Sequence, residues 1–323
     1  MLAGLCRAPR VSRWSLAAVL PVIAVGALAG CGGSSSTSSD SSGGGSAPIV
    51  AVGAENEYAN VISQIGGKYV KVSAIESNPN TDPHTFEASP SVAQEVSAAK
   101  LIVQNGVGYD DYMGKIESAS PSSSRKVIVV QHLLGLPDDT PNPHLWYKPV
   151  TMPAVAKALV TDLTALEPSH AAYFQANART FDASLQPWYN AIAAFKKDYP
   201  DTPVATTEPV GDYMLQAAGT TNMTPFTLQA AIMNGTDPAP QNVTLQNSLF
   251  SRHEVKVFVY NQQVTDTLTQ SFLKLAAQYG IPVVGVYETM PVPGYDYQSW
   301  MLAEVNALRK AVADKVSTQK LVP

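Results

Sequence analysis

Short apolar runs alternate with helical patterns in the first half of the chain after residue 47. Four runs predict strands, at 48–54, 69–77, 101–106 and 126–131. The segments between them have helical spacing, and the first helix should end at the Gly66–Gly67 pair. Strands that alternate with helices in this way predict a mainly parallel sheet that is covered on both faces.

The pattern becomes helical for about fifty residues after position 144. Residues 151–167 form one amphipathic segment, and residues 168–199 form a second, much longer one. At 1.5 Å per residue the second would extend roughly 45 Å, although Pro187 should kink or divide it. We interpret residues 166–200 as an interlobe helix that joins two lobes.

The alternation of strands and helices then resumes. Apolar runs at 202–208, 255–261 and 281–288 predict further strands, and a closing helix follows near the C-terminus. The predicted fold class is therefore α/β with two lobes, each a mainly parallel sheet flanked by helices. The N-terminal lobe should comprise residues 48–165 and the C-terminal lobe residues 201–323.

The first 47 residues carry the signals of export. Residues 1–30 have a basic start and an apolar run too short to span a membrane comfortably, which predicts a signal peptide. The run ends in "LAGC", and Cys31 is predicted to be the lipidated first residue of the mature protein. The rest of 31–47 is a Gly/Ser tether that cannot bury a core. A plain signal peptide with an incidental cysteine is the alternative.

Charge and cysteine content narrow the possible ligands. Three arginines precede Cys31 and no acid does, so removal of the signal lowers the net charge from −5 to −8. This balance argues against binding to nucleic acid or to anionic lipid surfaces. Only Cys6 and Cys31 are present, so a metal site in the folded part would use nitrogen and oxygen ligands.

Four residues of metal-ligand type follow predicted strands. In open α/β sheets ligands bind beyond the carboxyl ends of strands. At such positions the sequence has two histidines and two glutamates, namely His84, His144, Glu208 and Glu288. Such a mixed set of nitrogen and oxygen ligands suits divalent metals. Both histidines follow a proline, in "DPH" and "NPH".

Other interpretations of these residues remain open. Glu208 could stabilise the start of the following helix, and Glu288 could be a solvated strand end. His132 is a rival ligand. Asp82 could orient a histidine ring or only form the turn before Pro83, and Asn142 has the same two possibilities.

The motifs around these residues are similar to those of a known family. "DPHTFEASPSVAQEVSAAKLIVQNGVGYDDYM", "NPHLWYKP", "TTEPVGDYMLQAAG" and "VYETMPVPGYDYQSW" resemble the ligand segments of the metal-specific (zinc/manganese) substrate-binding lipoproteins of bacterial ABC importers. The resemblance covers about residues 48–315 and implies ligand roles for His84, His144, Glu208 and Glu288. Asn142 and Glu288 both stand where the family more often has Asp, and the His-rich loop of many zinc-type members is absent.

The resemblance implies an extracytoplasmic protein that is not an enzyme and that binds a divalent metal as transported ligand. Mn²⁺ is slightly favoured over Zn²⁺ because Glu208 makes the set richer in oxygen, whereas the general affinity order favours Zn²⁺. Expected partners are the membrane permease of the importer and the membrane itself, through the lipid anchor. We expect a monomer that binds no nucleic acid. A metal-dependent hydrolase and an adhesin-type lipoprotein with a structural metal are the alternative functions.

Overall fold

The computed structural model describes residues 47–291 and 293–321. The predicted signal peptide (1–30), Cys31 and all but the last residue of the tether lie outside these residues. Within the described part of the chain, no helix combines the length and the apolar character that crossing a membrane requires.

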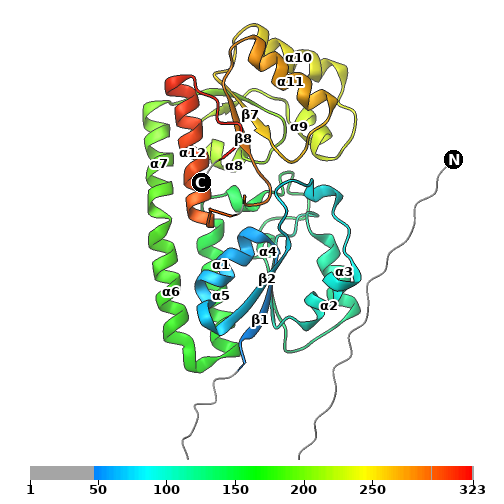
Figure 1. The fold of residues 1–323 in the computed structure, drawn as a ribbon, viewed down its shortest axis with the longest axis vertical. Helices are drawn as coiled ribbons and strands as arrows, with labels where there is room; N and C mark the ends of the chain where they lie inside the picture. Colours follow the sequence, from blue (N-terminus) through cyan, green and yellow to red (C-terminus); the bar gives the residue numbers. More distant parts are fainter. Residues whose placement is uncertain (1–46, 292, 322–323) are drawn as a thin grey trace, which may run out of the picture. The chain divides into compact units, whose positions relative to one another are not determined.

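The first sheet has four parallel strands in the order β2-β1-β3-β4 (Figure 1). Their bounds are β1 Ile49–Glu55, β2 Val70–Glu76, β3 Leu101–Gln104 and β4 Lys126–Val129. The central strand β1 is almost continuously buried, as expected of a parallel strand with helices on both faces. The predicted strand 126–131 is too long, since Val130 and Gln131 already begin a short helix.

The second sheet repeats this topology with the order β6-β5-β7-β8. All of its strands are parallel, with the bounds β5 Pro203–Thr206, β6 Thr221–Asn222, β7 Val257–Asn261 and β8 Val283–Val286. Strand β6 was not predicted, because a strand of two residues shows no hydrophobic period. In both sheets the strand order reverses beside the first strand, and the carboxyl ends of the strands meet there.

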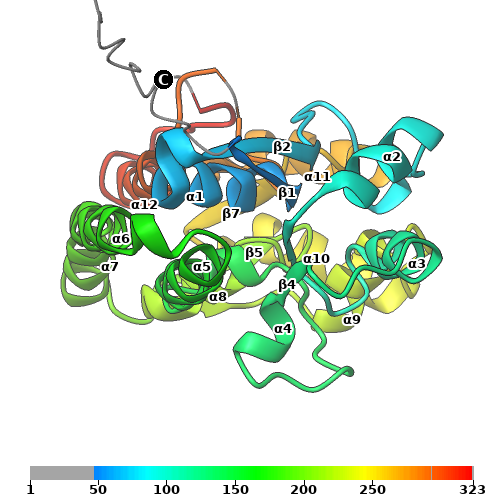
Figure 2. The same ribbon diagram turned by 90° about the horizontal axis from the view of Figure 1, so that it is seen from below.

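Helices cover both sheets (Figures 1 and 2). In the first half they are α1 Asn56–Gly66, α2 Pro90–Ala98, α3 Asp111–Ala119, α4 Val130–Leu133 and α5 Thr151–Leu166. In the second half they are α8 Asp212–Ala217, α9 Phe226–Met233, α10 Pro240–Ser251, α11 Thr267–Gln278 and α12 Tyr297–Asp314. As predicted, α1 ends at Gly66, and Gly67 follows with a φ of 52°, which favours glycine. Helix α9 was not predicted.

The long interlobe helix is divided at the predicted proline. A short 3₁₀ turn (Pro168–His170) leads into α6 (Ala171–Ser184) and α7 (Gln186–Asp198), and Leu185 between them keeps helical torsion angles. Figure 1 shows the two helices in succession along one side of the protein. Helix α6 packs against α1 and α5, whereas α7 packs against α8 and α12, so the pair braces the helices of both sheets.

The largest apolar core continues from one sheet to the other. It contains residues of β1 and β3 together with residues of β5, β7 and β8, and it includes the fully buried Trp146, Trp188 and Trp300. A second cluster fills the space between β7, α10 and α11. A core shared by both sheets opposes large rotations of one sheet against the other, because such rotations would break close packing.

The N-terminal cap of helix α12 should contribute measurably to the free energy of unfolding. Asp296 precedes α12, and its carboxylate accepts a hydrogen bond from the backbone N–H of Ser299 (2.9 Å), whose hydroxyl accepts one from the Asp296 N–H (3.0 Å). We expect Asp296→Ala to lower the free energy of unfolding by about 1 kcal/mol. Urea denaturation of the metal-free protein measures this change. Asp296→Ser should keep most of the stability, and equal losses in both variants would contradict the capping role.

Candidate metal centre

Both proline-histidine motifs form the same local turn. Asp82 Oδ1 accepts a hydrogen bond from the backbone N–H of His84 (2.9 Å), and Asn142 Oδ1 accepts one from the N–H of His144 (3.0 Å). Each turn leads into a 3₁₀ segment, Pro83–Thr85 in the first case and Leu145–Tyr147 in the second. The repeated sequence thus encodes a repeated backbone conformation that fixes the start of each histidine side chain.

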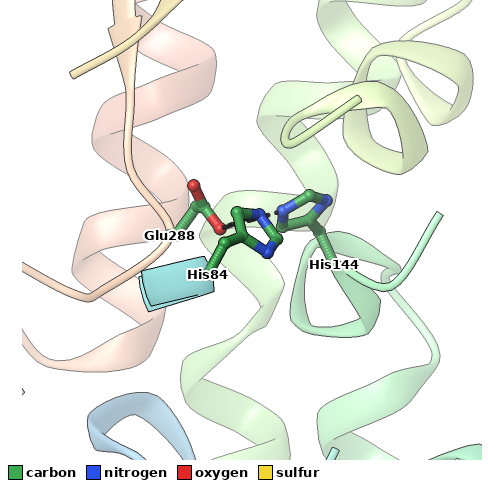
Figure 3. A group of neighbouring side chains, drawn as sticks. All are labelled: His84, His144 and Glu288. Carbon is green, nitrogen blue, oxygen red and sulfur yellow. Dashed lines mark hydrogen bonds and ion pairs between the residues drawn. The ribbon is translucent and has the colours of Figure 1, made fainter. Parts of the chain in front are cut away.

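The two histidines meet Glu288 at a single carboxylate oxygen (Figure 3). Glu288 Oε2 lies 3.0 Å from His84 Nε2 and 3.1 Å from His144 Nε2. One ligand atom from each of these residues lies within 4.8 Å of the others, and among the described residues this is the group that could hold a metal ion. His144 and Glu288 are fully buried, whereas the side chain of His84 is 20% exposed.

The orientation of the His144 ring shows that a proton or a cation is needed between His144 and Glu288. Asn142 Oδ1 accepts from a backbone N–H, so this atom is the oxygen, and it must also accept from His144 Nδ1 (2.8 Å). In neutral His144 the Nε2 lone pair then faces the Glu288 carboxylate at 3.1 Å. Two acceptors at this distance need a proton or a cation between them. His84 Nε2 likewise makes no well-aligned hydrogen bond, despite its short distance to Glu288.

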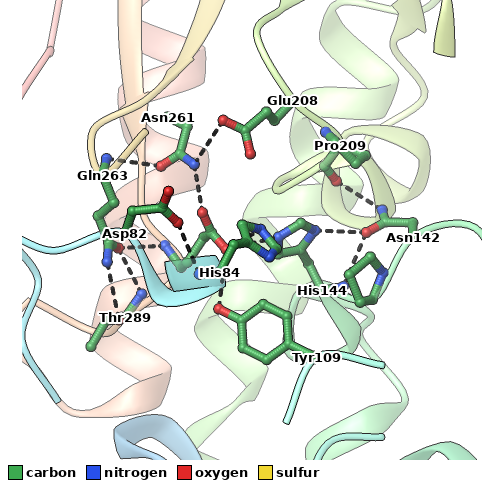
Figure 4. A network of polar contacts seen from close by, with 12 residues as sticks. Asp82, His84, Tyr109, Asn142, His144, Glu208, Pro209, Asn261, Gln263 and Thr289 are labelled. Carbon is green, nitrogen blue, oxygen red and sulfur yellow. Dashed lines mark hydrogen bonds and ion pairs between the residues drawn. The ribbon is translucent and has the colours of Figure 1, made fainter. Parts of the chain in front are cut away.

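The fourth predicted ligand, Glu208, lies beside this group but not in it (Figure 4). It follows β5 by two residues and is buried, with 2% exposure. Its Oε1 accepts a hydrogen bond from the amide of Asn261 (3.2 Å), and its Oε2 is buried without a partner. The same amide donates to Glu288 Oε1 (2.7 Å), so one side chain connects the two carboxylates.

The charges of the group depend on one another. Burial opposes ionisation of Glu288, yet the two imidazoles hold the pKa of its carboxyl well below its usual range. Burial lowers the pKa of His84, but attraction to Glu288 outweighs this and raises it overall. For fully buried His144 the effect of burial prevails and its pKa is lowered. Burial and the nearby charge of Glu288 raise the pKa of Glu208.

Further buried acids surround the group. Glu55, Glu57 and Glu76 lie at or just after the ends of β1 and β2, and their carboxylate oxygens are buried without hydrogen-bond partners. Burial is the main cause of their raised pKa values, and the charge of Glu288 contributes for Glu57 and Glu76. Among the described residues no Lys or Arg forms an ion pair with any of them. Raised pKa values favour the neutral, protonated form of these carboxyls in the metal-free protein, and a cation bound nearby would favour their ionised form.

The structure resolves several open interpretations. Asp82 forms the turn before Pro83 and bonds the backbone of His84, whereas Asn142 also orients the ring of His144. His132 is exposed on α4, away from the His84–His144–Glu288 group. Glu288 is buried rather than solvated.

Sequence reasoning missed two polar partners of Glu288. The Tyr109 hydroxyl donates to Glu288 Oε2 (3.0 Å), and Asn261 holds the other oxygen. Asn261 ends β7 and could have been sought by the same strand-end rule that found the ligands, but it is neither acidic nor a histidine. Tyr109 carries no comparable signal.

Loss of the Asn142 side chain should weaken metal binding without removing a ligand. Asn142→Ala frees the His144 ring, and loss of such an orienting partner typically costs about 10- to 100-fold in affinity. We expect a dissociation constant for Zn²⁺ raised by that factor in competition titrations. Asn190→Ala, which removes an exposed amide from α7, is the matched control. If both variants bind like the parent, Asn142 does not orient the ligand.

Comparisons with known proteins place the chain in a metal-uptake family. A family model described as zinc-uptake complex component A, periplasmic, matches residues 52–311. A protein of Thermotoga maritima that is named "Putative metal-binding protein" is 32% identical over 94 residues, which are 29% of this chain and 33% of that protein. The match with this curated relative therefore spans about a third of its length.

Solved structures share the fold. The periplasmic zinc-binding protein TroA of Treponema pallidum superimposes with a TM-score of 0.70 at 15% identity, covering 84% of this chain and all of that one. The binding protein FpvC of Pseudomonas aeruginosa in complex with Mn²⁺ gives a TM-score of 0.68 at 19% identity, over 83% of this chain and 100% of that one. These likenesses confirm the predicted α/β fold class.

Proposed function

The chain belongs to the family of the periplasmic zinc-uptake complex component A, and on that basis we propose that it captures a divalent transition metal between its two lobes and delivers the metal to the permease of an ABC importer. Members of this family are extracytoplasmic binding proteins rather than enzymes, so the prediction of a non-enzymatic protein is confirmed and the hydrolase alternative falls. One observation supports the proposal most directly. The Nε2 atoms of His84 and His144 both lie beside the same carboxylate oxygen of Glu288.

We assign Glu208 as the fourth ligand. Its free Oε2 is buried without a partner, and its carboxylate shares Asn261 with Glu288. A buried carboxylate oxygen without a donor is unfavourable unless it is protonated or meets a cation. A metal that draws Glu208 into the group would satisfy this oxygen and complete a set of two nitrogen and two carboxylate ligands.

Metal titration tests the assignment. Residues 48–323, stripped of metal, should bind one Zn²⁺ or Mn²⁺ per chain in calorimetry, and His84→Ala and Glu208→Ala should each abolish tight binding while the protein stays folded. Glu254→Ala, at an exposed position, is the control. If Glu208→Ala instead unfolds the protein, the metal is structural, as in the adhesin-type alternative. If the parent binds no metal, the proposed transport function is wrong.

We further propose that Cys31 anchors the protein to the outer face of the cytoplasmic membrane and that the folded part is a monomer. The "LAGC" sequence and the Gly/Ser stretch after it support the anchor. Replacement Cys31→Ser should move the protein from the membrane fraction to the soluble fraction. Light scattering on residues 48–323 should give the mass of one chain, and the mass of a dimer would refute the monomer.

Small movements should accompany metal capture. The α6–α7 pair and the shared core brace both sheets, so we expect local changes around Glu208 and Glu288 rather than wide opening. The donor set leaves the choice of metal finely balanced. Two carboxylates suit Mn²⁺, the metal slightly favoured from the sequence, whereas the general affinity order favours Zn²⁺. The preference between Mn²⁺ and Zn²⁺ depends on whether each carboxylate binds the metal through one oxygen or through both.

A further inference from the structure

Asn261 lies between the carboxylates of Glu208 and Glu288 and donates a hydrogen bond to each of them. It ends β7, which lies between β5 and β8, the strands that lead to Glu208 and Glu288. Its side chain is fully buried. Its backbone N–H donates to the Thr207 hydroxyl (2.9 Å), which ties this strand end to the start of the Glu208 segment.

The orientation of the Asn261 amide follows from its partners. Asn261 Oδ1 accepts a hydrogen bond from the backbone N–H of Gln263 (3.0 Å), so this atom must be the oxygen. The atom that faces the glutamates is therefore the NH₂ group, with two hydrogens to donate. One is directed to Glu208 Oε1 (3.2 Å), as Figure 4 shows, and the other to Glu288 Oε1 (2.7 Å).

Each carboxylate consequently has one oxygen bound to the amide and one left over. For Glu288 the remaining Oε2 already faces both imidazoles, and for Glu208 the remaining Oε2 has no partner. The segment that carries Glu288 is also held in place, because Gln263 Oε1 accepts from the backbone N–H groups of Glu288 (2.7 Å) and Thr289 (2.8 Å). Each hydrogen bond from Asn261 fixes the orientation of a carboxylate, so binding a metal through both oxygens would require that carboxylate to reorient about this bond.

We propose that Asn261 is a positioning residue that limits Glu208 and Glu288 to one ligand oxygen each and thereby favours four-coordinate cations over six-coordinate ones. The inference rests on the proposed function, with Glu208 as the fourth ligand. Four protein ligands in a tetrahedral arrangement suit Zn²⁺, whereas Mn²⁺ prefers more oxygen ligands. Without the amide each carboxylate could bind through both oxygens, which would help Mn²⁺ and loosen the geometry for Zn²⁺.

The test uses Asn261→Ala and the smaller change in polarity Asn261→Ser, in the same protein of residues 48–323. Titrations with Zn²⁺ and Mn²⁺ give the ratio of the two dissociation constants. We expect this ratio to shift toward Mn²⁺ by about 10-fold or more in both variants, the size typical of partners that orient metal ligands. Visible absorption of the Co²⁺ complex reports coordination number directly, and the intense bands of a four-coordinate ion should weaken in both variants.

Asn222→Ala is the matched control. This amide lies in the same sheet and donates to a carboxylate outside the site, Asp212 Oδ1 (3.0 Å). It should leave both the metal ratio and the Co²⁺ spectrum unchanged. A weakly absorbing, six-coordinate Co²⁺ complex in the parent would overturn the inference, as would an unchanged ratio and spectrum in folded, metal-binding Asn261 variants. Absence of metal binding in the parent would instead refute the proposed function itself.

Discussion

Glu288→Gln should weaken divalent metal binding by more than about 100-fold, beyond the loss typical of an orienting partner. The substitution removes the negative charge at the oxygen that both imidazoles share. Gln has nearly the same shape, so its carbonyl can still accept from Asn261 while its NH₂ takes the place of the oxygen that faces His84, His144 and Tyr109. An NH₂ group has no lone pair to give to a metal, so the substitution removes this ligand atom as well as its charge.

Calorimetric titration with Zn²⁺ and thermal unfolding of the metal-free protein check this prediction together. Thermal unfolding without metal shows whether the variant still folds, and its melting temperature should fall modestly, because the favourable interaction of the Glu288 charge with the two imidazoles is lost. Exposed Glu254→Gln removes the same charge elsewhere and should bind normally. Parent-like affinity in Glu288→Gln would mean that the metal binds outside the His84–His144–Glu288 group.

Metal affinity should fall about tenfold for each unit of pH once His84 takes up a proton. The metal requires neutral imidazoles, so protons compete with it. Because the pKa of His84 is raised, this competition should begin at or above the ordinary histidine value of about 6.5. The pKa of His144 is lowered, so a steeper loss should follow only at more acidic pH.

Titrations between pH 8 and pH 5 test this order of events. Because His84→Ala should abolish tight binding at any pH, the decline is followed in the parent protein, where its slope should steepen at the more acidic pH at which His144 also takes up a proton. Constant affinity from pH 7.5 to pH 5 in the parent would be incompatible with a site that contains two histidines.

The metal-free protein should respond to pH in the opposite sense. The raised pKa of His84 contributes stability that is complete below the unfolded value of about 6.5 and is lost as the pH rises through the folded value. The depressed pKa of Glu288 contributes stability that is present above about 4.3 and is lost as the pH falls through the folded value. Their joint contribution is therefore greatest between about pH 4.3 and 6.5. Melting temperatures without metal should show this, while added metal should stabilise most above that range.

The sequence by itself determined the features that depend on neighbouring residues. Apolar runs between helical patterns specify two parallel sheets, because buried parallel strands need apolar residues throughout. The turns at Pro83 and Pro143 follow from an Asx residue two positions before each histidine. Pro187 divides the long helix because its ring cannot accommodate the preceding turn. The strand-end rule brought His84, His144 and Glu288 together from positions up to 204 residues apart.

Only the tertiary structure decided how these residues meet. It placed the side-chain amide of Asn261 between Glu208 and the His84–His144–Glu288 group. It also placed Glu288 Oε2 next to Tyr109 and both histidines. It also gave Asn261 both carboxylates as partners. These relations depend on how side chains from separate strands pack across the interlobe space, and no local period or cap encodes a distance between residues far apart in the chain. Sequence can therefore predict which residues reach this space, whereas packing determines which oxygen of each carboxylate is free to bind a metal.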